Sequence, residues 1–155
     1  MLATQSTLVV NAGSSSLKVK LLPQNLSLLV ERIGGQSKVK ASFANIENVA
    51  IKNHDEALRV CLETLSSQLE LSEIRLVTHR VVHGGERYTE PVILDEKIIA
   101  EIADLSNLAP LHNPANLEGI RAASVLLPHA THVAVFDTAF HATLPAKAFL
   151  YGLPR

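Results

Sequence analysis

Leu8-Val-Val-Asn-Ala-Gly-Ser-Ser-Ser-Leu-Lys-Val-Lys-Leu-Leu22 places a short polar turn between two apolar runs. Apolar runs that flank a turn rich in Gly and Ser predict a β-hairpin. Two further short apolar segments, residues 27–32 and 38–43, lie on either side of Gly34-Gly35 and predict more strands of the same kind. The beginning of the chain is therefore expected to form a β-meander.

The remainder of the chain predicts alternating helices and strands. Apolar residues recur there at helical spacing, and short apolar runs between them have the pattern of buried strands. The predicted helices occupy residues 54–70 with Asn53 or Asp55 as N-cap, begin after Asp95, and run from Asn113-Pro114 to Pro128, and the predicted strands occupy residues 74–77 and 132–136. A meander followed by such alternation predicts an α/β fold in which helices pack on a mixed sheet.

Composition excludes several classes of protein. The chain has 155 residues, of which 47% are hydrophobic, and this is enough for a single domain with its own core. The net charge is −1, with no block of like charge, so nothing indicates a nucleic-acid surface. The single cysteine, Cys61, excludes a disulfide framework and falls on the apolar side of a predicted helix, where a buried thiol is expected. No signal peptide or membrane-spanning run is present in the sequence, which predicts a cytoplasmic protein without a membrane partner.

The turn of the predicted hairpin has the residue types of a phosphate site. Gly13 permits positive φ and close approach of the backbone to an anion. Ser14 and Ser16 add hydroxyl donors, and Lys18 adds a charge that reaches phosphate oxygens. Asn11 ends the first strand, where its side-chain oxygen is suited to a magnesium ion or a water in that ion's shell. The alternative is an ordinary hairpin, because Asn, Gly and Ser are common turn residues.

Two charged residues follow predicted strands, where open α/β sheets place their ligands. Arg80 comes after the strand predicted to end at Val77, and its guanidinium can hold a carboxylate or phosphate with two hydrogen bonds. A structural ion pair with an acid is an equal alternative for Arg80. Asp137 follows the strand of residues 132–136 and is placed to orient a nucleophile or a magnesium shell. Its alternative role is that of an N-cap.

Four motifs together resemble the acetate and propionate kinase family. In order they are NAGSSSLK (residues 11–18), HRVVHGGERYTE (79–90), LAPLHNPANLEGI (108–120) and VAVFDTAFHATLPAKAFLYGLP (133–154). The match covers nearly the whole chain and is weakest at residues 23–71. The resemblance implies the RNase H-like fold of the actin, hexokinase and chaperone-type ATPases, with residues 1–155 forming an N-terminal domain.

The resemblance also implies roles for the residues of the hairpin. Asn11 matches the asparagine of the family's magnesium site, and Lys18 matches the lysine associated with ATP. Ser14 and Ser16 belong to the same phosphate loop. Mg²⁺ and the co-substrate ATP are therefore expected at this hairpin.

The carboxylate side of the site is implied by four further positions. Arg80 matches the arginine that binds the acetate carboxylate, and Val82 and Leu111 match side chains that line an apolar pocket for the methyl group. Asp137 matches the aspartate usually called the active-site acid or base. Because acetate is already ionised at neutral pH, we expect Asp137 to position the magnesium ion or the carboxylate instead.

The implied reaction is reversible phosphoryl transfer from ATP to acetate, giving acetyl phosphate and ADP. Members of the family are more than twice as long as this chain and form homodimers. The chain is therefore expected to lack the C-terminal nucleotide-binding domain and to have little activity alone. Two alternatives remain open, a non-catalytic domain that binds a short acid or phosphate, and a propionate kinase, since one methylene changes selectivity by only roughly 1 to 3 kcal/mol.

Overall fold

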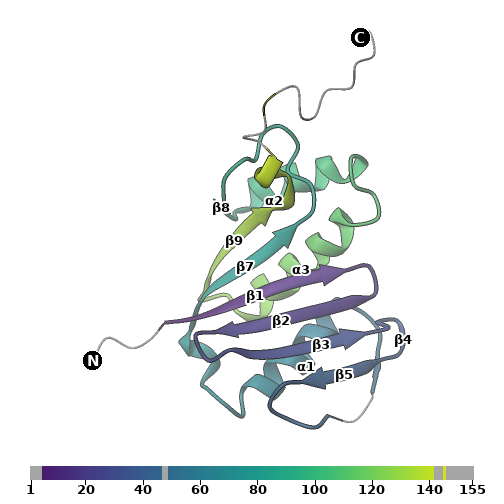
Figure 1. The fold of residues 1–155 in the computed structure, drawn as a ribbon, viewed down its shortest axis with the longest axis vertical. Coiled ribbons are helices and arrows are strands. Elements are labelled where there is room, and N and C mark those ends of the chain that lie inside the picture. Colours follow the sequence, from purple (N-terminus) through teal and green to yellow (C-terminus); the bar gives the residue numbers. More distant parts are fainter. Residues whose placement is uncertain (1–4, 47–48, 142–144, 146–155) are drawn as a thin grey trace.

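The computed structural model describes residues 5–46, 49–141 and 145. Seven strands form the main sheet in the order β5-β3-β2-β1-β7-β9-β8 (Figure 1). Their bounds are β1 (Ser6–Gly13), β2 (Ser16–Leu22), β3 (Leu26–Glu31), β5 (Lys38–Ala41), β7 (Ile74–Val81), β8 (Val92–Ile93) and β9 (Thr131–Phe136), and β4 (Gly35–Gln36) pairs separately with β6 (Ala50–Ile51). The helices are α1 (His54–Leu65), α2 (Glu96–Asp104) and α3 (Asn113–Leu126). Short 3₁₀ turns lie before β7 at Leu71–Glu73, between α2 and α3 at Leu105–Asn107, and after β9 at Asp137–His141.

The sheet confirms the predicted meander and its mixed character. β1, β2, β3 and β5 pair antiparallel in sequence order, whereas β7 pairs parallel with both β1 and β9. β8 adds an antiparallel edge next to β9. This is the α/β, RNase H-like arrangement that the sequence led us to expect.

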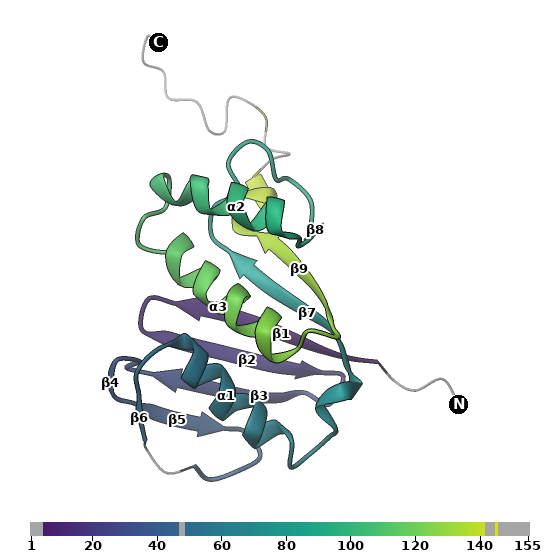
Figure 2. The same ribbon diagram turned by 180° about the vertical axis from the view of Figure 1, so that it is seen from behind.

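The helices lie on one face of this sheet. In Figure 1 the sheet is in front of α1 and α3, and Figure 2 shows the same helices from behind, in front of the sheet. Strand alternation explains the division, because Leu8, Val10 and Ala12 of β1 are buried beneath the helices, whereas Val9 and Asn11 point to the opposite face. The site residues described below stand on that opposite face or at the strand ends.

Three predicted boundaries were wrong. Asn11 was expected to end the first strand, but β1 continues to Gly13 because its pairing with β2 extends to Ser16. The strand expected at residues 74–77 continues to Val81, because Thr78–Val81 alternates and both β1 and β9 pair with it. Arg80 therefore lies inside β7 rather than after it. The helix expected to reach residue 70 ends at Leu65. There the Ser66 and Ser67 hydroxyls bond to nearby backbone carbonyls, which competes with continuation of the helix.

Other local predictions are confirmed. Asn53 caps α1 by accepting from the Glu56 N–H, and Asp95 caps α2 by accepting from the Ile98 N–H. α3 begins at Asn113 and ends at Leu126, two residues before Pro128. Cys61 is fully buried on the inner side of α1, and burial raises the pKa of its thiol to about 12.

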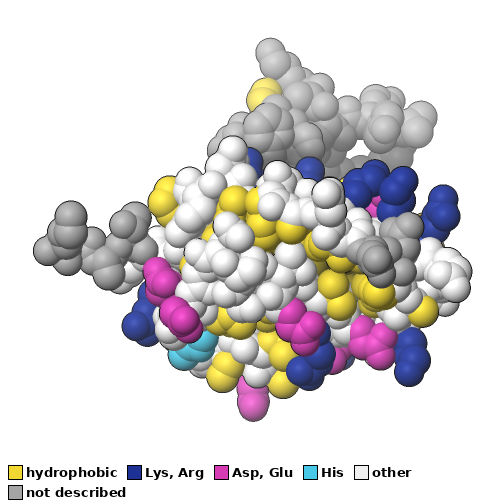
Figure 3. All heavy atoms as spheres, turned by 90° about the horizontal axis from the view of Figure 1, so that it is seen from below, with side chains coloured by type: hydrophobic (Ala, Val, Ile, Leu, Met, Phe, Trp, Pro, Cys, Tyr) yellow, Lys and Arg dark blue, Asp and Glu magenta, His cyan; other side chains and the backbone are white. Residues whose placement is uncertain are grey.

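The end of the molecule formed by β5 and α1 carries no large block of one charge among its described residues (Figure 3). Figure 3 shows this end, where basic and acidic side chains are interspersed around hydrophobic patches. Among the described helices, none combines the length and the apolar character needed to cross a membrane.

Candidate functional site

Arg80, Asp137 and Asn11 come together at the ends of three neighbouring strands. The Arg80 Nε donates to Asp137 Oδ1 and Oδ2 at 3.0 and 2.9 Å, and its Nη2 donates to Oδ2 at 2.6 Å. Its Nη1 donates to Asn11 Oδ1 at 3.3 Å. The strand order β1-β7-β9 makes this meeting possible, since Asn11 and Arg80 lie within the last three residues of β1 and β7 and Asp137 directly follows β9. Three of the predicted site residues are thus brought into one cluster.

The Arg80 guanidinium is held along one edge and open along another. Asp137 occupies the edge formed by Nε and Nη2, and Nη1 donates to Asn11, so one N–H of Nη1 and one of Nη2 have no partner among the described residues. The side chains of Arg80 and Asp137 are 48% and 41% exposed, so a small anion has access to them. The hydrogen bonds that Arg80 donates to Asp137 raise the pKa of Arg80, so its positive charge is permanent. The pair therefore forms an oriented cationic surface.

The serine turn closes the hairpin between β1 and β2. Gly13 pairs with Ser16, which leaves Ser14 and Ser15 as the turn, and Ser14 is exposed. The positive φ that Gly13 permits is not adopted, and the described glycines with positive φ are Gly34 and Gly85. Glycine is required there for space, since a Cβ at Gly13 would lie 2.8 Å from the Ser16 Oγ.

Lys18 stands on the same face of the sheet as the Arg80 cluster. It pairs in register with Asn11 across the β1–β2 ladder, so both side chains point away from the helices. Lys18 is exposed and lines a cavity of about 310 Å³ together with Leu29 and Lys40. The predicted role of Lys18, Ser14 and Ser16 toward phosphate stays a prediction.

The predicted apolar pocket is less evident. Val82 directly follows β7 and is half-buried, whereas Leu111 is 76% exposed. Residues this different in exposure do not by themselves enclose a methyl group. The assignment of Val82 and Leu111 to substrate therefore also stays a prediction.

Three residues bond to the backbone around the site, and sequence reasoning did not assign any of them to it. The amide of Asn116 bonds to the backbone of both Ala12 and Val82, and the amide of Asn113 bonds twice to the backbone of His83. The His54 ring, at the start of α1, bonds to the Gly13 carbonyl. The signal in the sequence is the pair of asparagines three positions apart, which places both on one side of α3.

Comparison with known proteins gives the family of this chain. The model of the acetokinase family matches residues 6–155. The chain belongs to the acetokinase family. The acetate kinase of Thermotoga maritima is 46% identical, and the alignment covers 95% of this chain and 40% of that protein. The acetate kinase of Staphylococcus aureus strain NCTC 8325 is 47% identical, with the same coverage.

Solved structures of the acetokinase family have the same fold. Acetate kinase of Porphyromonas gingivalis superposes with a TM-score of 0.87 at 38% identity, covering 98% of this chain and 42% of that chain. A propionate kinase from Francisella tularensis gives a TM-score of 0.87 at 33% identity, covering 97% and 41%. The chain thus spans about two fifths of the length of the relatives that it matches.

The acetokinase motifs differ in how much of them the structure describes. The first three lie wholly within the described residues, whereas the fourth continues from His141 into residues that lie largely outside them. Asp137 is the part of the fourth motif that the structure connects to the site, through Arg80. It begins the 3₁₀ turn after β9, so its position also suits the helix start considered as its alternative role.

The oxygen atoms of this site suit a magnesium ion that is also bound by substrate phosphates and water. Within the described part of the chain, no group of three or more His, Cys, Asp or Glu side chains is placed to hold a metal. Asn11 and Asp137 do present oxygen atoms on either side of Arg80. Mg²⁺ typically keeps several waters and binds through one or two protein oxygens plus substrate phosphates. These two donors fit that sparse mode and do not form a complete protein cage.

Proposed function

We propose that this chain is the N-terminal domain of an acetate kinase, which transfers a phosphoryl group reversibly between ATP and acetate. The observation that supports it most is the Arg80 guanidinium, fixed by Asp137 and open along its outer end. A planar cation held in one orientation suits a small carboxylate, which it can bind through two parallel hydrogen bonds. The family match and the solved relatives support the same reaction.

In this mechanism the protein acts mainly by positioning. Arg80 holds the acetate carboxylate so that one oxygen points toward the γ-phosphorus of ATP, for attack in line with the leaving ADP oxygen. Asp137 orients Arg80 and removes no proton, because acetate is already ionised at neutral pH. Val82 and Leu111 are proposed to contact the acetate methyl group. Catalysis through positioning and charge neutralisation is typical of phosphoryl transfer.

The hairpin is proposed to face the phosphate chain of the nucleotide. Lys18 supplies a positive charge, and Ser14 and Ser16 supply hydroxyl donors. Asn11, with Asp137, would hold the Mg²⁺ that accompanies ATP, and that ion would neutralise charge on the phosphates. We also propose a cytoplasmic location and a homodimer for the whole enzyme, both on the strength of the family resemblance.

Because the chain spans about 40% of its acetate kinase relatives, we propose that it is nearly inactive alone. The charge of a transferring phosphoryl group needs more partners than Arg80 and Lys18 provide. Trapping of acetyl phosphate with hydroxylamine measures this directly. Acetyl phosphate formed by the purified chain at a normal kinase rate would refute the proposal of near inactivity.

Propionate is the second candidate substrate. The structural similarity to a propionate kinase, at the same TM-score as to an acetate kinase, favours keeping it. The two acids differ by one methylene, which a small apolar pocket distinguishes by roughly 1 to 3 kcal/mol. Titrating the chain with acetate and with propionate, and comparing the two Kd values, measures which acid it prefers.

The binding step is tested by titrating the ¹⁵N-labelled chain with sodium acetate at constant ionic strength, following the Arg80 Nε–H signal and the backbone amide signals of residues 80–83. We expect saturable shifts, and we expect the backbone shifts to be lost in Arg80→Ala. Arg121→Ala is the matched control, because Arg121 is an exposed arginine on α3, on the helical side of the sheet. Equal acetate affinity in the Arg80 and Arg121 variants would exclude Arg80 as the carboxylate ligand.

A further inference from the structure

Asn116 is a buried amide whose two ends bond to different parts of the site. It is 3% exposed, and its Oδ1 accepts from the Val82 N–H at 3.0 Å. Its Nδ2 donates to the Ala12 carbonyl at 2.7 Å. An amide that donates at one end and accepts at the other can connect two backbone segments without leaving either unsatisfied.

The two segments are the strand ends that carry Asn11 and Arg80. The β1–β7 ladder has its last pair at Val10 and His79, so the strands lose their direct pairing just before the site begins. Ala12 follows Asn11 directly, and Val82 lies two residues after Arg80. Asn116 thus replaces the hydrogen bonding that the ladder no longer supplies at this point.

A close approach of α3 to β1 places Asn116 there. Gly119 lies one helical turn after Asn116, and a Cβ at Gly119 would come within 2.8 Å of the Ala12 Cβ. Only glycine permits this distance between α3 and β1. The short distance lets the Asn116 side chain reach the Ala12 carbonyl from the helix.

Direct contact between the site residues is weaker than this bridge. The Arg80 Nη1 and Asn11 Oδ1 atoms are 3.3 Å apart, compared with 2.7 and 3.0 Å for the two bonds of Asn116. Arg80 and Asn11 are also side chains near the surface, whereas Asn116 is buried. Beyond the end of the β1–β7 ladder, the bonds of Asn116 are therefore the shorter and more deeply buried of these side-chain connections between the hairpin and the Arg80 strand.

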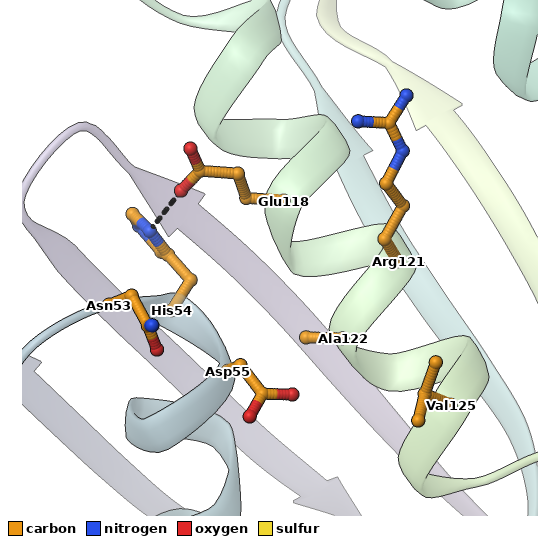
Figure 4. Close-up of a pocket in the computed structure, with 7 residues that line it drawn as sticks. All are labelled: Asn53, His54, Asp55, Glu118, Arg121, Ala122 and Val125. Carbon is orange, nitrogen blue, oxygen red and sulfur yellow. Dashed lines mark ion pairs between the residues drawn. The ribbon is translucent and has the colours of Figure 1, made fainter.

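Two neighbouring residues hold one segment each. The side-chain amide of Asn113 is fully buried, and among the described residues it bonds to the His83 backbone alone, at 3.2 and 3.1 Å. His54 bonds to the Gly13 carbonyl at 2.6 Å and to Glu118 of α3 at 2.7 Å. Figure 4 shows the His54 ring directed from the start of α1 toward Glu118 on α3. Asn113 serves the β7 side and His54 the hairpin side, whereas Asn116 serves both.

We propose that Asn116 is a positioning residue for phosphoryl transfer, which keeps the phosphate-facing hairpin and the carboxylate-binding Arg80 at their working separation. The inference rests on the proposed function, in which Arg80 holds the acid and the hairpin faces the nucleotide. Asn116 itself contacts neither ligand. Through Asn116, a displacement of the hairpin is transmitted to the segment after β7, and the reverse.

The test compares Asn116→Ala, Asn113→Ala and His54→Gln in the ¹⁵N-labelled chain titrated with acetate. In the unmodified chain, acetate is expected to shift the Arg80 Nε–H signal and also the hairpin amides of Gly13 and Ser14. Asn116→Ala is expected to abolish the hairpin shifts and to raise the acetate Kd roughly tenfold, the effect of one misplaced hydrogen bond. Asn113→Ala is expected to keep the hairpin shifts, because its bonds do not reach the hairpin.

Two controls separate positioning from stability. Leu65→Ala removes a fully buried side chain at the far end of α1, so it lowers stability without touching the site. It is expected to leave the acetate Kd and the hairpin shifts unchanged wherever the chain stays folded. Asn116→Asp keeps the acceptor for the Val82 N–H but cannot donate to Ala12, and is expected to lose the hairpin shifts as Asn116→Ala does. Hairpin shifts that survive in Asn116→Ala would overturn the inference.

Failure of the proposed function gives a different result. If acetate does not shift the Arg80 signal of the unmodified chain, acetate binding by Arg80 is refuted. The positioning role of Asn116 is then tested by amide hydrogen exchange in the absence of acetate. Asn116→Ala is expected to speed amide exchange or to shift signals in both the hairpin and residues 82–84. Asn113→Ala is expected to change only residues 82–84, and His54→Gln only the hairpin. Changes confined to one segment in Asn116→Ala would overturn the inference independently of acetate.

Discussion

His79 is expected to make the fold sensitive to mild acid. Its side chain is 2% exposed, and its Nε2 lies 3.1 Å from the Nδ1 of His132, whose other ring nitrogen lies 3.0 Å from the Leu127 carbonyl. Burial, with a smaller contribution from His132, lowers the pKa of His79 from 6.5 to about 3. The pKa of His132 is lowered as well, chiefly by burial. The folded chain therefore keeps this pair neutral.

The direction and size of the effect follow from proton uptake. Between about pH 6.5 and 3 the unfolded chain binds a proton at His79 that the folded chain does not bind, so stability falls as the pH falls. For His79 alone, the change from pH 7 to pH 5 amounts to about 2 kcal/mol. In a domain of this size that corresponds to a decrease in Tm of roughly 4 to 8 °C. Below about pH 3 the contribution levels off, because both states are then protonated.

Urea unfolding at pH 7 and pH 5 measures the effect in the unmodified chain and in His79→Gln. Glutamine does not titrate, and its side-chain amide can still donate to the His132 Nδ1. Every other titrating group, including His132, remains in both chains. The unmodified chain is expected to lose about 2 kcal/mol more than the variant over this interval. Unfolding free energies that decrease in parallel would show that burial of neutral His79 is not the cause.

Three further predictions concern local structure. Cys61 is expected to react with a thiol reagent such as DTNB only at the rate of unfolding, because it is buried and its pKa is raised to about 12; fast reaction in native buffer would contradict this. Gly119→Ala is expected to destabilise the chain by about 1 kcal/mol in thermal unfolding, because overpacking against Ala12 exceeds the roughly 1 kcal/mol gain in helix propensity; a stabilised variant would show that α3 shifts freely. Asp95→Ala is expected to cost about 1 kcal/mol through loss of the bond from the Ile98 N–H, with Asp95→Asn as the control that retains the cap.

Most of the fold could be predicted from the sequence because the patterns that indicate strands, turns and helix caps are local. The hairpin, the meander and the caps at Asn53 and Asp95 follow from periodicity and turn chemistry, and each is present in the structure. The errors came where local and long-range effects compete. β7 continues to Val81 because two neighbouring strands pair with it, which no local pattern reveals.

The site was predictable in its parts but not in its connections. Asn11, Arg80 and Asp137 were each identified from residue type and from their position at strand ends, and the structure brings them together. The role of Asn116 could not be read in this way, since an asparagine inside a helix has no sequence signal for which backbone groups it meets. Its partners, Ala12 and Val82, are 104 and 34 residues away. Such distances become contacts only through the packing of α3 on the sheet.

Arg80 also shows why two interpretations of one residue need not exclude each other. From the sequence, a structural ion pair and a ligand-binding role were equal alternatives, and the acid that pairs with Arg80 is Asp137, the other charged residue of the site. A guanidinium has two edges, and the pair with Asp137 occupies only the edge formed by Nε and Nη2. An ion pair at one edge removes rotational freedom that a ligand would otherwise have to restrict on binding. In the proposed function, the pairing of Arg80 with Asp137 is thus the feature that would make a long, half-exposed side chain precise enough to orient a small carboxylate.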